Sequence, residues 1–521
     1  MLNPTPSATQ RVEADEHSFE IYSSVIFQLG ERLISDEIQA LIELIKNAYD
    51  ANATYVNIVV STTDTPPFSR KFADCVGYVS IEDDGEGMTK ERVRDGWLTI
   101  SNSIKKQSKQ NQRQEESETG QRTPLGDKGL GRLGAQRLGS NLEMWTRPHG
   151  SEEEYHVAIA WRDFAEKELL SQVKIRLESV APPMVFTGTK HGTRLIISGL
   201  SKESVDLWRG TLKGKEFRNR LSEMVSPYRE ASALRLLVTV DGQKIELAEI
   251  GERLRDTAHL HYDIFFGQEI NEKQGNQWIF RSVGKAKLEY LRPPKKDAQA
   301  KWNRIVEDGG HDLFDFLKNR YSSKTGQRYQ LERCFEGDQL SNRWFVSFKF
   351  ERLFEDFVGL ATLEGKAANP GAFTGQVDSF NLSADFSKRQ GIFDQPSEYK
   401  LYVKELSGIR IYRDGFRVNA DRDWLRLGSQ RNSGASNYGL RPDNVAGYIA
   451  ISARENFVLE EKTDREGFIA TPHSANFMKV MDEWREFTGS IQDFLKRGVI
   501  DYLKQMDLAP VENPIPTPEA I

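Results

Sequence analysis

Apolar side chains recur every three or four residues in one early stretch of the chain, ISDEIQALIELIKNAYDANAT. The recurring positions are Ile38, Leu41, Ile42, Ile45, Ala48 and Tyr49. A period near 3.6 predicts an amphipathic helix with one buried face. Ser35 or Asp36 precedes the apolar series and is a favourable N-cap, so we expect the helix to begin there.

Shorter runs after this helix have the apolar pattern that is typical of strands. They are YVNIVVS, GYVSIED, NLEMWTR, YHVAIAW and TRLIISGL. A segment at about residues 103–134 separates the second run from the third and is polar and glutamine-rich before it becomes glycine-rich. We expect its polar part to be a mobile loop and its glycine-rich end to open another helix.

The pattern changes after about residue 205. Residues 255–380 mix aromatic strands with polar loops, and their pattern assigns no role to them. The stretch GIRIYRDGFRV predicts a hairpin that turns at Asp414 and Gly415. Residues 473–508 indicate one long helix or a helix pair, and the proline-rich residues 509–521 indicate a disordered tail.

Composition bounds the class of protein. Of 521 residues, 38% are hydrophobic and 28% charged, so we expect a soluble protein of two or three domains. The net charge of −6 excludes a uniformly cationic DNA-coating protein but leaves a local basic face open. No apolar run is long enough to predict a membrane span. The two cysteines, Cys75 and Cys334, lie far apart, which argues against a disulfide framework or a cysteine zinc site and favours the reducing cytoplasm.

The stretch VSIEDDGEGMTKERV concentrates four carboxylates on a glycine-containing turn. They are Glu82, Asp83, Asp84 and Glu86, and they surround Gly85 and Gly87. A calcium loop of the EF-hand type does not fit, because no register gives oxygen ligands at alternate positions with a closing Glu. Taken alone, the stretch is equally compatible with a solvated acidic turn and with a binding site.

Polar residues also follow one edge of the predicted helix. Glu43, Asn47 and Asp50 stand at i, i+4 and i+7, so their side chains share a face beside the apolar stripe. By themselves they are more typical of the polar edge of an ordinary amphipathic helix than of a site.

A glycine series, GDKGLGRLGAQRLG, follows the polar loop. Glycines let backbone N–H groups approach an anion, and Lys128 and Arg132 could neutralise phosphate oxygens. The series is not a P-loop, since no G-K-[ST] closes it, and no strand-turn-helix unit makes it a dinucleotide fingerprint. Further along, HGTRLIISGL places Gly192 and Thr193 at the head of a strand.

In this order and at these separations, the four pieces resemble the GHKL ATPases, which include DNA gyrase B, the ninety-kilodalton heat-shock chaperone, histidine kinases and MutL proteins. ELIKNAYDA is similar to the family's N box, DDGEGM to its D-x-G-x-G-M box, GDKGLGRLG to its second glycine box and HGT to its third. The resemblance covers about residues 25–205. It implies an α+β fold, a Bergerat-type ATP-binding sandwich of a mixed sheet with helices on one face, followed by a transducer-like α/β domain.

The resemblance implies roles at the base of the nucleotide. Asp83 would accept a hydrogen bond from the adenine amino group, and Thr193 would bond near the adenine. Gly85 and Gly87 would let the backbone pass close to the base, and Met88 would cover it. The other three acidic residues of the turn would be bystanders.

It also implies roles at the phosphates. Glu43 would be the general base toward the attacking water, Asn47 would give an oxygen to Mg²⁺, and Asp50 would belong to the ATP site. Further ATP-binding positions would be Gly126, Lys128, Gly129, Leu130, Gly131, Arg132 and Gly134, behind an ATP lid at about 103–134.

The implied domain plan is a flexible segment 1–20, an ATP-binding domain 21–230, a transducer-like domain 231–472 with an unassigned insertion at about 255–380, and the C-terminal segments above. Lys462 is the candidate for a transducer lysine that reaches the γ-phosphate, with Arg431 and Lys404 as alternatives. The layout is similar to MutL and microrchidia ATPases. It implies a homodimer when ATP is bound and a load that is DNA or a protein complex. A chaperone-like remodeller and a nucleotide-sensing regulatory protein of a larger system remain alternatives.

Overall fold

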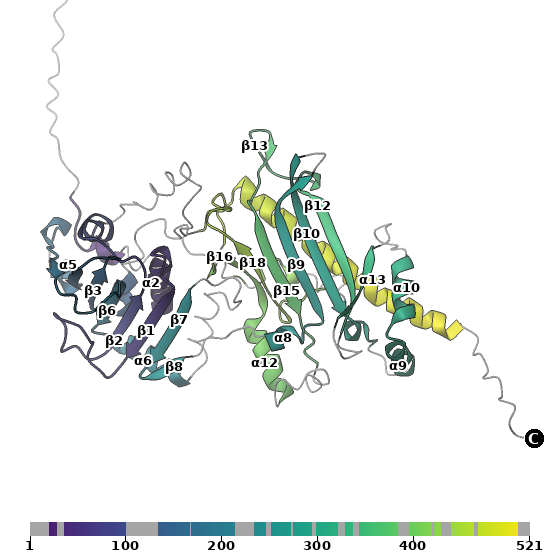
Figure 1. The fold of residues 1–521 in the computed structure, drawn as a ribbon, viewed down its shortest axis with the longest axis horizontal. Coiled ribbons are helices and arrows are strands. Elements are labelled where there is room, and N and C mark those ends of the chain that lie inside the picture. Colours follow the sequence, from purple (N-terminus) through teal and green to yellow (C-terminus); the bar gives the residue numbers. More distant parts are fainter. Residues whose placement is uncertain are drawn as a thin grey trace, which may run out of the picture. The chain divides into compact units, whose positions relative to one another are not determined.

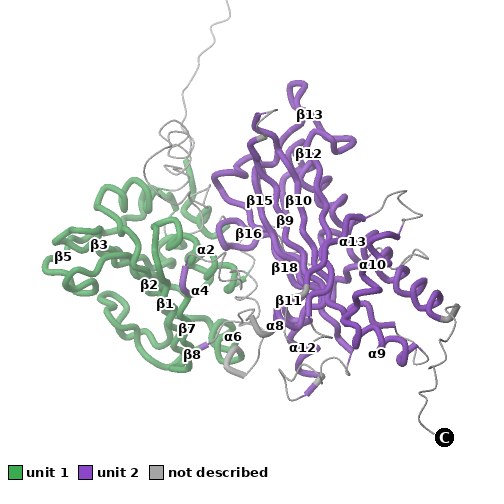
Figure 2. Tube along the Cα trace, turned by 45° about the vertical axis from the view of Figure 1, so that its right-hand side comes forward, with its two compact units in different colours: residues 1–122, 126–213, 236–244 green, residues 123–125, 214–235, 245–521 purple. Residues whose placement is uncertain are grey.

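The computed structural model divides the chain into two compact units (Figure 2). Described residues up to 213, with 236–244, form the first unit, and those from 245 onwards belong to the second. The residues that the structure describes are 20–28, 36–99, 134–166, 168–213, 234–245, 252–271, 275–293, 298–320, 329–336, 343–383, 395–418, 421, 423–428, 439–462 and 467–508.

The first unit is built on an eight-stranded sheet, counted over the described residues, in the order β5-β4-β3-β6-β2-β1-β7-β8. Its elements are α2 (Glu37–Asp50), β1 (Tyr55–Ser61), β2 (Tyr78–Asp83), η1 (Arg92–Trp97), α4 (Ala135–Leu138), β3 (Asn141–Arg147), β4 (Glu154–Ala160), α5 (Arg162–Glu166), η3 (Leu170–Gln172), β5 (Leu177–Val180), β6 (Gly192–Ser198), α6 (Lys202–Lys213), β7 (Arg235–Val240) and β8 (Gln243–Ile245).

Helix α2 forms where the apolar spacing predicts it and packs against the sheet (Figure 1). Asp36 is its N-cap, and the carboxylate accepts a hydrogen bond of 3.0 Å from the Gln39 backbone N–H. The predicted stripe is buried, and the helix ends at Asp50. All five predicted strand runs of this half are strands, because alternation with one buried face matches the pleat.

The first unit extends past residue 230. β7 and β8 continue the first sheet beyond β1, so the strand RLLVTVDG joins the sheet that precedes it in the chain. Residues 214–233, which precede β7, lie outside the described residues.

The second unit has its own eight-stranded sheet among the described residues, in the order β11-β12-β10-β9-β15-β18-β16-β17. Its elements are α8 (Glu252–Arg255), β9 (Leu260–Asn271), β10 (Gly275–Lys287), η5 (Leu288–Leu291), α9 (Gln299–Glu307), α10 (His311–Asn319), β11 (Leu331–Glu336), β12 (Trp344–Leu353), η7 (Phe354–Asp356), β13 (Thr362–Leu363), β14 (Lys366–Ala367), β15 (Phe373–Ser379), α12 (Pro396–Leu406), β16 (Gly408–Arg413), β17 (Phe416–Arg417), β18 (Val445–Ile451) and α13 (Pro472–Leu508).

Residues 255–380, to which the sequence pattern assigns no role, supply β9, β10, β12 and β15 at the centre of this sheet. The hairpin predicted at Asp414 and Gly415 is present: both residues have positive φ, and β16 pairs with β17 across them. β16 also pairs with β18 in parallel, which makes the sheet mixed. The expected combination of an α/β sandwich with a second α/β domain is therefore confirmed.

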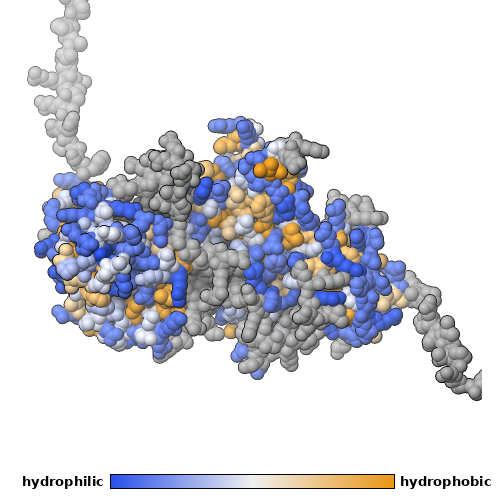
Figure 3. Space-filling view, viewed as in Figure 1, coloured by the Kyte–Doolittle hydropathy of each residue, from blue (hydrophilic) through white to orange (hydrophobic). Residues whose placement is uncertain are grey.

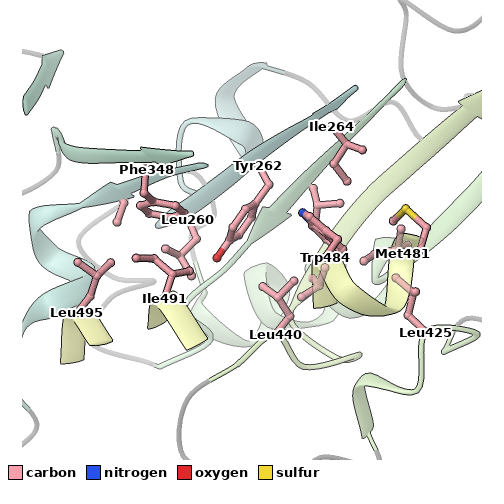
Figure 4. Packing of buried hydrophobic residues seen from close by; sticks show 14 of the residues in the cluster. Leu260, Tyr262, Ile264, Phe348, Leu425, Leu440, Met481, Trp484, Ile491 and Leu495 are labelled. Carbon is pink, nitrogen blue, oxygen red and sulfur yellow. The ribbon is translucent and has the colours of Figure 1, made fainter. Parts of the chain in front are cut away.

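Helix α13 is a single helix of 37 residues and covers one face of the second sheet. Figure 4 shows Tyr262 of β9 and Trp484 of α13 side by side in this core, with their ring centroids 5.8 Å apart. The Trp484 indole N–H donates to Ser282 Oγ of β10 at 3.0 Å, so the one polar atom of that ring is satisfied.

Among the described residues, no helix is long and apolar enough to cross a membrane. The face of the molecule seen in Figure 3 mixes hydrophilic and hydrophobic residues over both units.

Candidate functional site

Three of the four carboxylates on the acidic turn after β2 are held by partners within the protein. Asp84 accepts hydrogen bonds from the backbone N–H groups of Thr54 and Tyr55, at 2.7 and 3.0 Å. Glu86 accepts one from Asn52 Nδ2 at 2.6 Å. Glu82 forms an ion pair with Arg194 of β6. These three side chains therefore shape the turn and its neighbours.

Asp83 differs from its neighbours because it is buried, with 7% of its surface exposed. Burial raises the pKa of its carboxyl group to about 7, although hydrogen bonds from the backbones of Gly85 and Thr193 act in the opposite direction. The Gly85 N–H donates to Asp83 Oδ1 at 2.9 Å. A buried carboxylate with so few donors has capacity for another hydrogen bond.

The strand register places Asp83 in a row of polar side chains. Asp83 of β2 faces Thr193 of β6, and Thr193 faces Thr146 of β3. Directly opposed residues lie on one face of a sheet. The neighbouring row, which contains Glu82, Arg194 and Trp145, lies on the other face.

Thr146 links this row to the acidic turn. Its side chain is fully buried, and its Oγ1 accepts a hydrogen bond of 2.9 Å from the Met88 backbone N–H. The same oxygen lies 3.1 Å from the Gly192 carbonyl oxygen and 3.0 Å from Thr193 Oγ1. Met88, the predicted cover of the base, is thus fixed through its backbone.

Three glycines allow backbone segments to meet around Asp83. A Cβ on Gly85 would stand 2.6 Å from the Ala51 carbonyl oxygen. Gly87 has a φ of +68° and lies against the Arg147 carbonyl, and Gly192 has a φ of +133° and lies against the Asp83 carbonyl. Any side chain at these positions would force the segments apart.

The C-terminal end of α2 contacts this turn. The Glu86 N–H donates to the Ala51 carbonyl oxygen at 2.8 Å, directly after the last residue of the helix, Asp50. Glu43 lies two turns earlier, so at about 1.5 Å per residue it is roughly 10 Å further along the axis. Glu43 and Asp50 are partly exposed and Asn47 is exposed. The structure therefore brings one end of α2 to Asp83 and carries Glu43 away from it.

Most of the predicted phosphate loop lies outside the described residues. This concerns the lid at about 103–134 and Gly126, Lys128, Gly129, Leu130, Gly131 and Arg132. Gly134 is described and stands at the start of α4, which contacts α2, β3 and β6.

The candidate basic residues for the γ-phosphate come from the second half of the chain. Lys462 is exposed and follows β18 in an irregular segment, where its backbone N–H donates to the Gly467 carbonyl oxygen at 3.0 Å. Lys404 is exposed in the last turn of α12. Arg431 lies outside the described residues.

No described group of three or more His, Cys, Asp or Glu side chains could hold a metal ion. An oxygen such as that of Asn47, on an exposed helix edge, suits a cation that keeps most of its ligands from phosphate and water, as Mg²⁺ does.

Thr146 is the residue of this site that the sequence pattern missed. A threonine inside the strand NLEMWTR looks like any other strand residue, and only the register with β6 reveals its contacts with Thr193 and the acidic turn. No local signal in the sequence could have identified it.

Residues 35–193 match the model of a family described as histidine kinase-, DNA gyrase B- and HSP90-like ATPase. No curated protein matches the chain. Among solved structures, the chain is similar to one titled as the N-terminal domain of a DNA repair protein. The identity is 12%, the match covers 93% of this chain and 99% of the other, and the TM-score is 0.39.

Proposed function

We propose that this protein is a Mg²⁺-dependent ATPase that works as a conformational switch, since residues 35–193 match the model of the histidine kinase-, DNA gyrase B- and HSP90-like ATPase family. Asp83 is the observation that carries the proposal. It is a buried carboxylate at the C-terminal end of β2, an interior strand of the sheet, and three glycines bring the surrounding backbone close to it.

At the base end, Asp83 accepts a hydrogen bond from the exocyclic amino group of adenine, and Thr193 lies beside it in the same row. A nucleotide without that donor would leave the buried carboxylate short of a hydrogen bond on its ligand side, which disfavours binding. Gly85, Gly87 and the Met88 backbone form the turn that borders the base.

At the phosphate end, Glu43 orients or deprotonates the water that attacks the γ-phosphate, and Asp50 belongs to the same edge of α2. Asn47 would hold Mg²⁺ through its side-chain oxygen, and the ion, when bound, would neutralise phosphate charge. The glycine series 126–134, with Lys128 and Arg132, surrounds the phosphates. Catalysis then rests on positioning and electrostatic stabilisation.

ATP binding closes the lid and promotes homodimerisation, and hydrolysis reverses both. The load is DNA or a protein complex, and Lys462 contacts the γ-phosphate in the closed state. Slow turnover follows if lid closure limits the rate.

The test compares Mg-ATP hydrolysis by the wild type and by Glu43→Ala, with the oligomeric state followed in the same samples. We expect the wild type to turn over, and the variant to bind ATP without hydrolysing it and to accumulate as a dimer. Glu37→Ala, which removes a carboxylate from the first turn of the same helix, is the matched control and retains activity. If wild type and Glu43→Ala hydrolyse ATP equally, Glu43 is not the base.

Two alternatives make different predictions in the same preparation. Salt-sensitive binding of the ATP-bound dimer to DNA supports a DNA load. Suppression of aggregation of an unfolded client, without DNA binding, supports a chaperone-like remodeller. ATP binding with no hydrolysis and no change of association state supports a nucleotide-sensing regulatory protein.

A further inference from the structure

The Thr146 hydroxyl carries one proton and has three polar neighbours. It is fully buried on β3, and three polar atoms lie within 3.1 Å of its Oγ1: the Met88 backbone nitrogen, the Gly192 carbonyl oxygen and Thr193 Oγ1. A threonine hydroxyl donates one hydrogen bond and accepts up to two.

Two of the three neighbours have a fixed role. The Met88 N–H can only donate, so Thr146 accepts from it, and the Gly192 carbonyl can only accept, so Thr146 must donate to it. The proton of Thr146 is then used. The contact with Thr193 becomes a hydrogen bond only if Thr193 donates its own proton to Thr146. All three contacts are satisfied in this one arrangement.

We infer that Thr146 is a positioning residue that makes the Thr193 hydroxyl an acceptor on its pocket side and thereby selects a 6-amino purine over a 6-oxo purine. This inference rests on the proposed function, because it concerns the base end of the same ATP site. Thr146 itself touches no part of the nucleotide.

The selection follows from the row Thr146–Thr193–Asp83. With the Thr193 proton directed at Thr146, Thr193 and the ionised carboxylate of Asp83 both present lone pairs at the base edge. An adenine amino group, or a water that donates to both, meets two acceptors. The carbonyl oxygen of a 6-oxo purine would face acceptors only and would bring no donor for them.

The experiment measures the dissociation constants of ATP and inosine triphosphate for the full chain. The discrimination ratio is the dissociation constant of inosine triphosphate divided by that of ATP. We expect Thr146→Val, which keeps the shape of the side chain and removes the hydroxyl, to free the Thr193 proton for a 6-oxo group. The ratio should fall about tenfold, the size of one neutral hydrogen bond. Thr146→Ser restores the hydroxyl and should restore the ratio.

Thr62→Val is the matched control. Thr62 is also buried in the first unit and bonds to Asp241, with 2.9 Å between Thr62 Oγ1 and Asp241 Oδ2. It lies outside the row, so its loss can lower stability but should leave the ratio unchanged. A ratio that falls equally in Thr62→Val and Thr146→Val would show a general loss of order and overturn the inference.

Thr193→Val provides a test that does not depend on the folding of a Thr146 variant. It removes the hydroxyl whose direction is at issue, so it should alter the ratio, and adding Thr146→Val to it should change the ratio no further. Unchanged discrimination in Thr193→Val would refute the inference. A wild type that binds ATP and inosine triphosphate equally would also refute it while leaving ATP binding intact, whereas a wild type that binds neither removes the proposed function itself.

Discussion

The first unit buries two carboxylates whose surroundings differ: Glu143, within β3, and Asp83, at the end of β2. Glu143 is 1% exposed and accepts hydrogen bonds from Ser69 Oγ and from the backbone N–H groups of Arg70, Lys71 and Phe72. In addition, His156 Nε2 lies 3.0 Å from Glu143 Oε2. Asp83 is 7% exposed, and within the described residues its hydrogen bonds come from the backbones of Gly85 and Thr193.

The difference is visible in the two pKa values. Burial raises the pKa of Glu143, but hydrogen bonds from His156, Arg70, Ser69 and Lys71 outweigh burial and lower the pKa to about 2. Burial of Asp83 prevails over its fewer donors and raises its pKa to about 7. A buried carboxylate whose donors come from the protein fastens a loop, and one with too few donors is suited to a donor from a ligand. In this sheet, the number of hydrogen-bond donors that the protein supplies distinguishes a structural buried carboxylate from a candidate ligand-binding one.

The largest expected effect on stability is that of replacing Glu143. Glu143→Ala leaves three backbone N–H groups of the loop after β1 without their acceptor, so we expect a loss of roughly 3–5 kcal/mol in the free energy of unfolding. Denaturant unfolding measures it. Glu178→Ala, which removes a partly exposed partner of Arg70, is the control and should cost less than about 1 kcal/mol. Similar losses in the two variants would mean that Glu143 does not fasten the loop.

Asp83→Asn should have the opposite profile. The amide keeps an oxygen for the Gly85 N–H and carries no charge to be buried, so the free energy of unfolding at pH 8 should stay equal or rise. ATP affinity should fall at least about 100-fold, because the NH₂ of the amide would face the adenine amino group. Calorimetric ATP titration checks the affinity. Large destabilisation with unchanged affinity would place Asp83 in the same class as Glu143.

The pH dependence of stability sharpens the comparison without any nucleotide. The folded pKa of Asp83 lies above its unfolded value, so folding is favoured by its proton, and wild-type stability relative to Asp83→Asn should decrease as pH rises from about 4 to about 7. The slope is at most about 1.4 kcal/mol per pH unit. Glu143 has the opposite sign: its contribution is present above the unfolded pKa and is lost as pH falls through about 2. Parallel unfolding curves for wild type and Asp83→Asn at every pH would contradict the assignment.

The local pattern predicted the elements that carry the site. The helical stripe with its Asp36 cap, the strands of the first half and the Asp414–Gly415 turn all form as expected, because periodicity and turn chemistry act over neighbouring residues. The acidic turn could be singled out, but its four carboxylates look alike in the sequence. Only the resemblance distinguished Asp83.

What could not be predicted depends on contacts that are remote in the chain. Glu143 looks like an ordinary strand residue until residues 69–72 are placed against it. The sequence pattern assigned no role to the aromatic strands of residues 255–380. In the sheet, β9 lies between β10 and β15, and this order depends on pairing between strands that are remote in the chain. Pairing register, the property that revealed Thr146, is likewise absent from any short stretch.

The smallest expected effect concerns Asp84, which is adjacent to Asp83 in the chain but belongs with Glu143 in kind. Burial raises the pKa of Asp84, yet hydrogen bonds from Thr54 and Tyr55 outweigh it and lower the pKa. Its contribution to stability is therefore present above the unfolded pKa and is lost as pH falls below it. Asp84→Ala should reduce the free energy of unfolding by about 1 kcal/mol, since it is only partly buried, and should leave ATP affinity within about threefold of the wild type. Denaturant unfolding and ATP titration on one preparation decide the matter. If Asp84→Ala weakened ATP binding as much as Asp83→Asn, the number of donors from the protein would not be what separates the two carboxylates, and the turn would bind nucleotide as a whole.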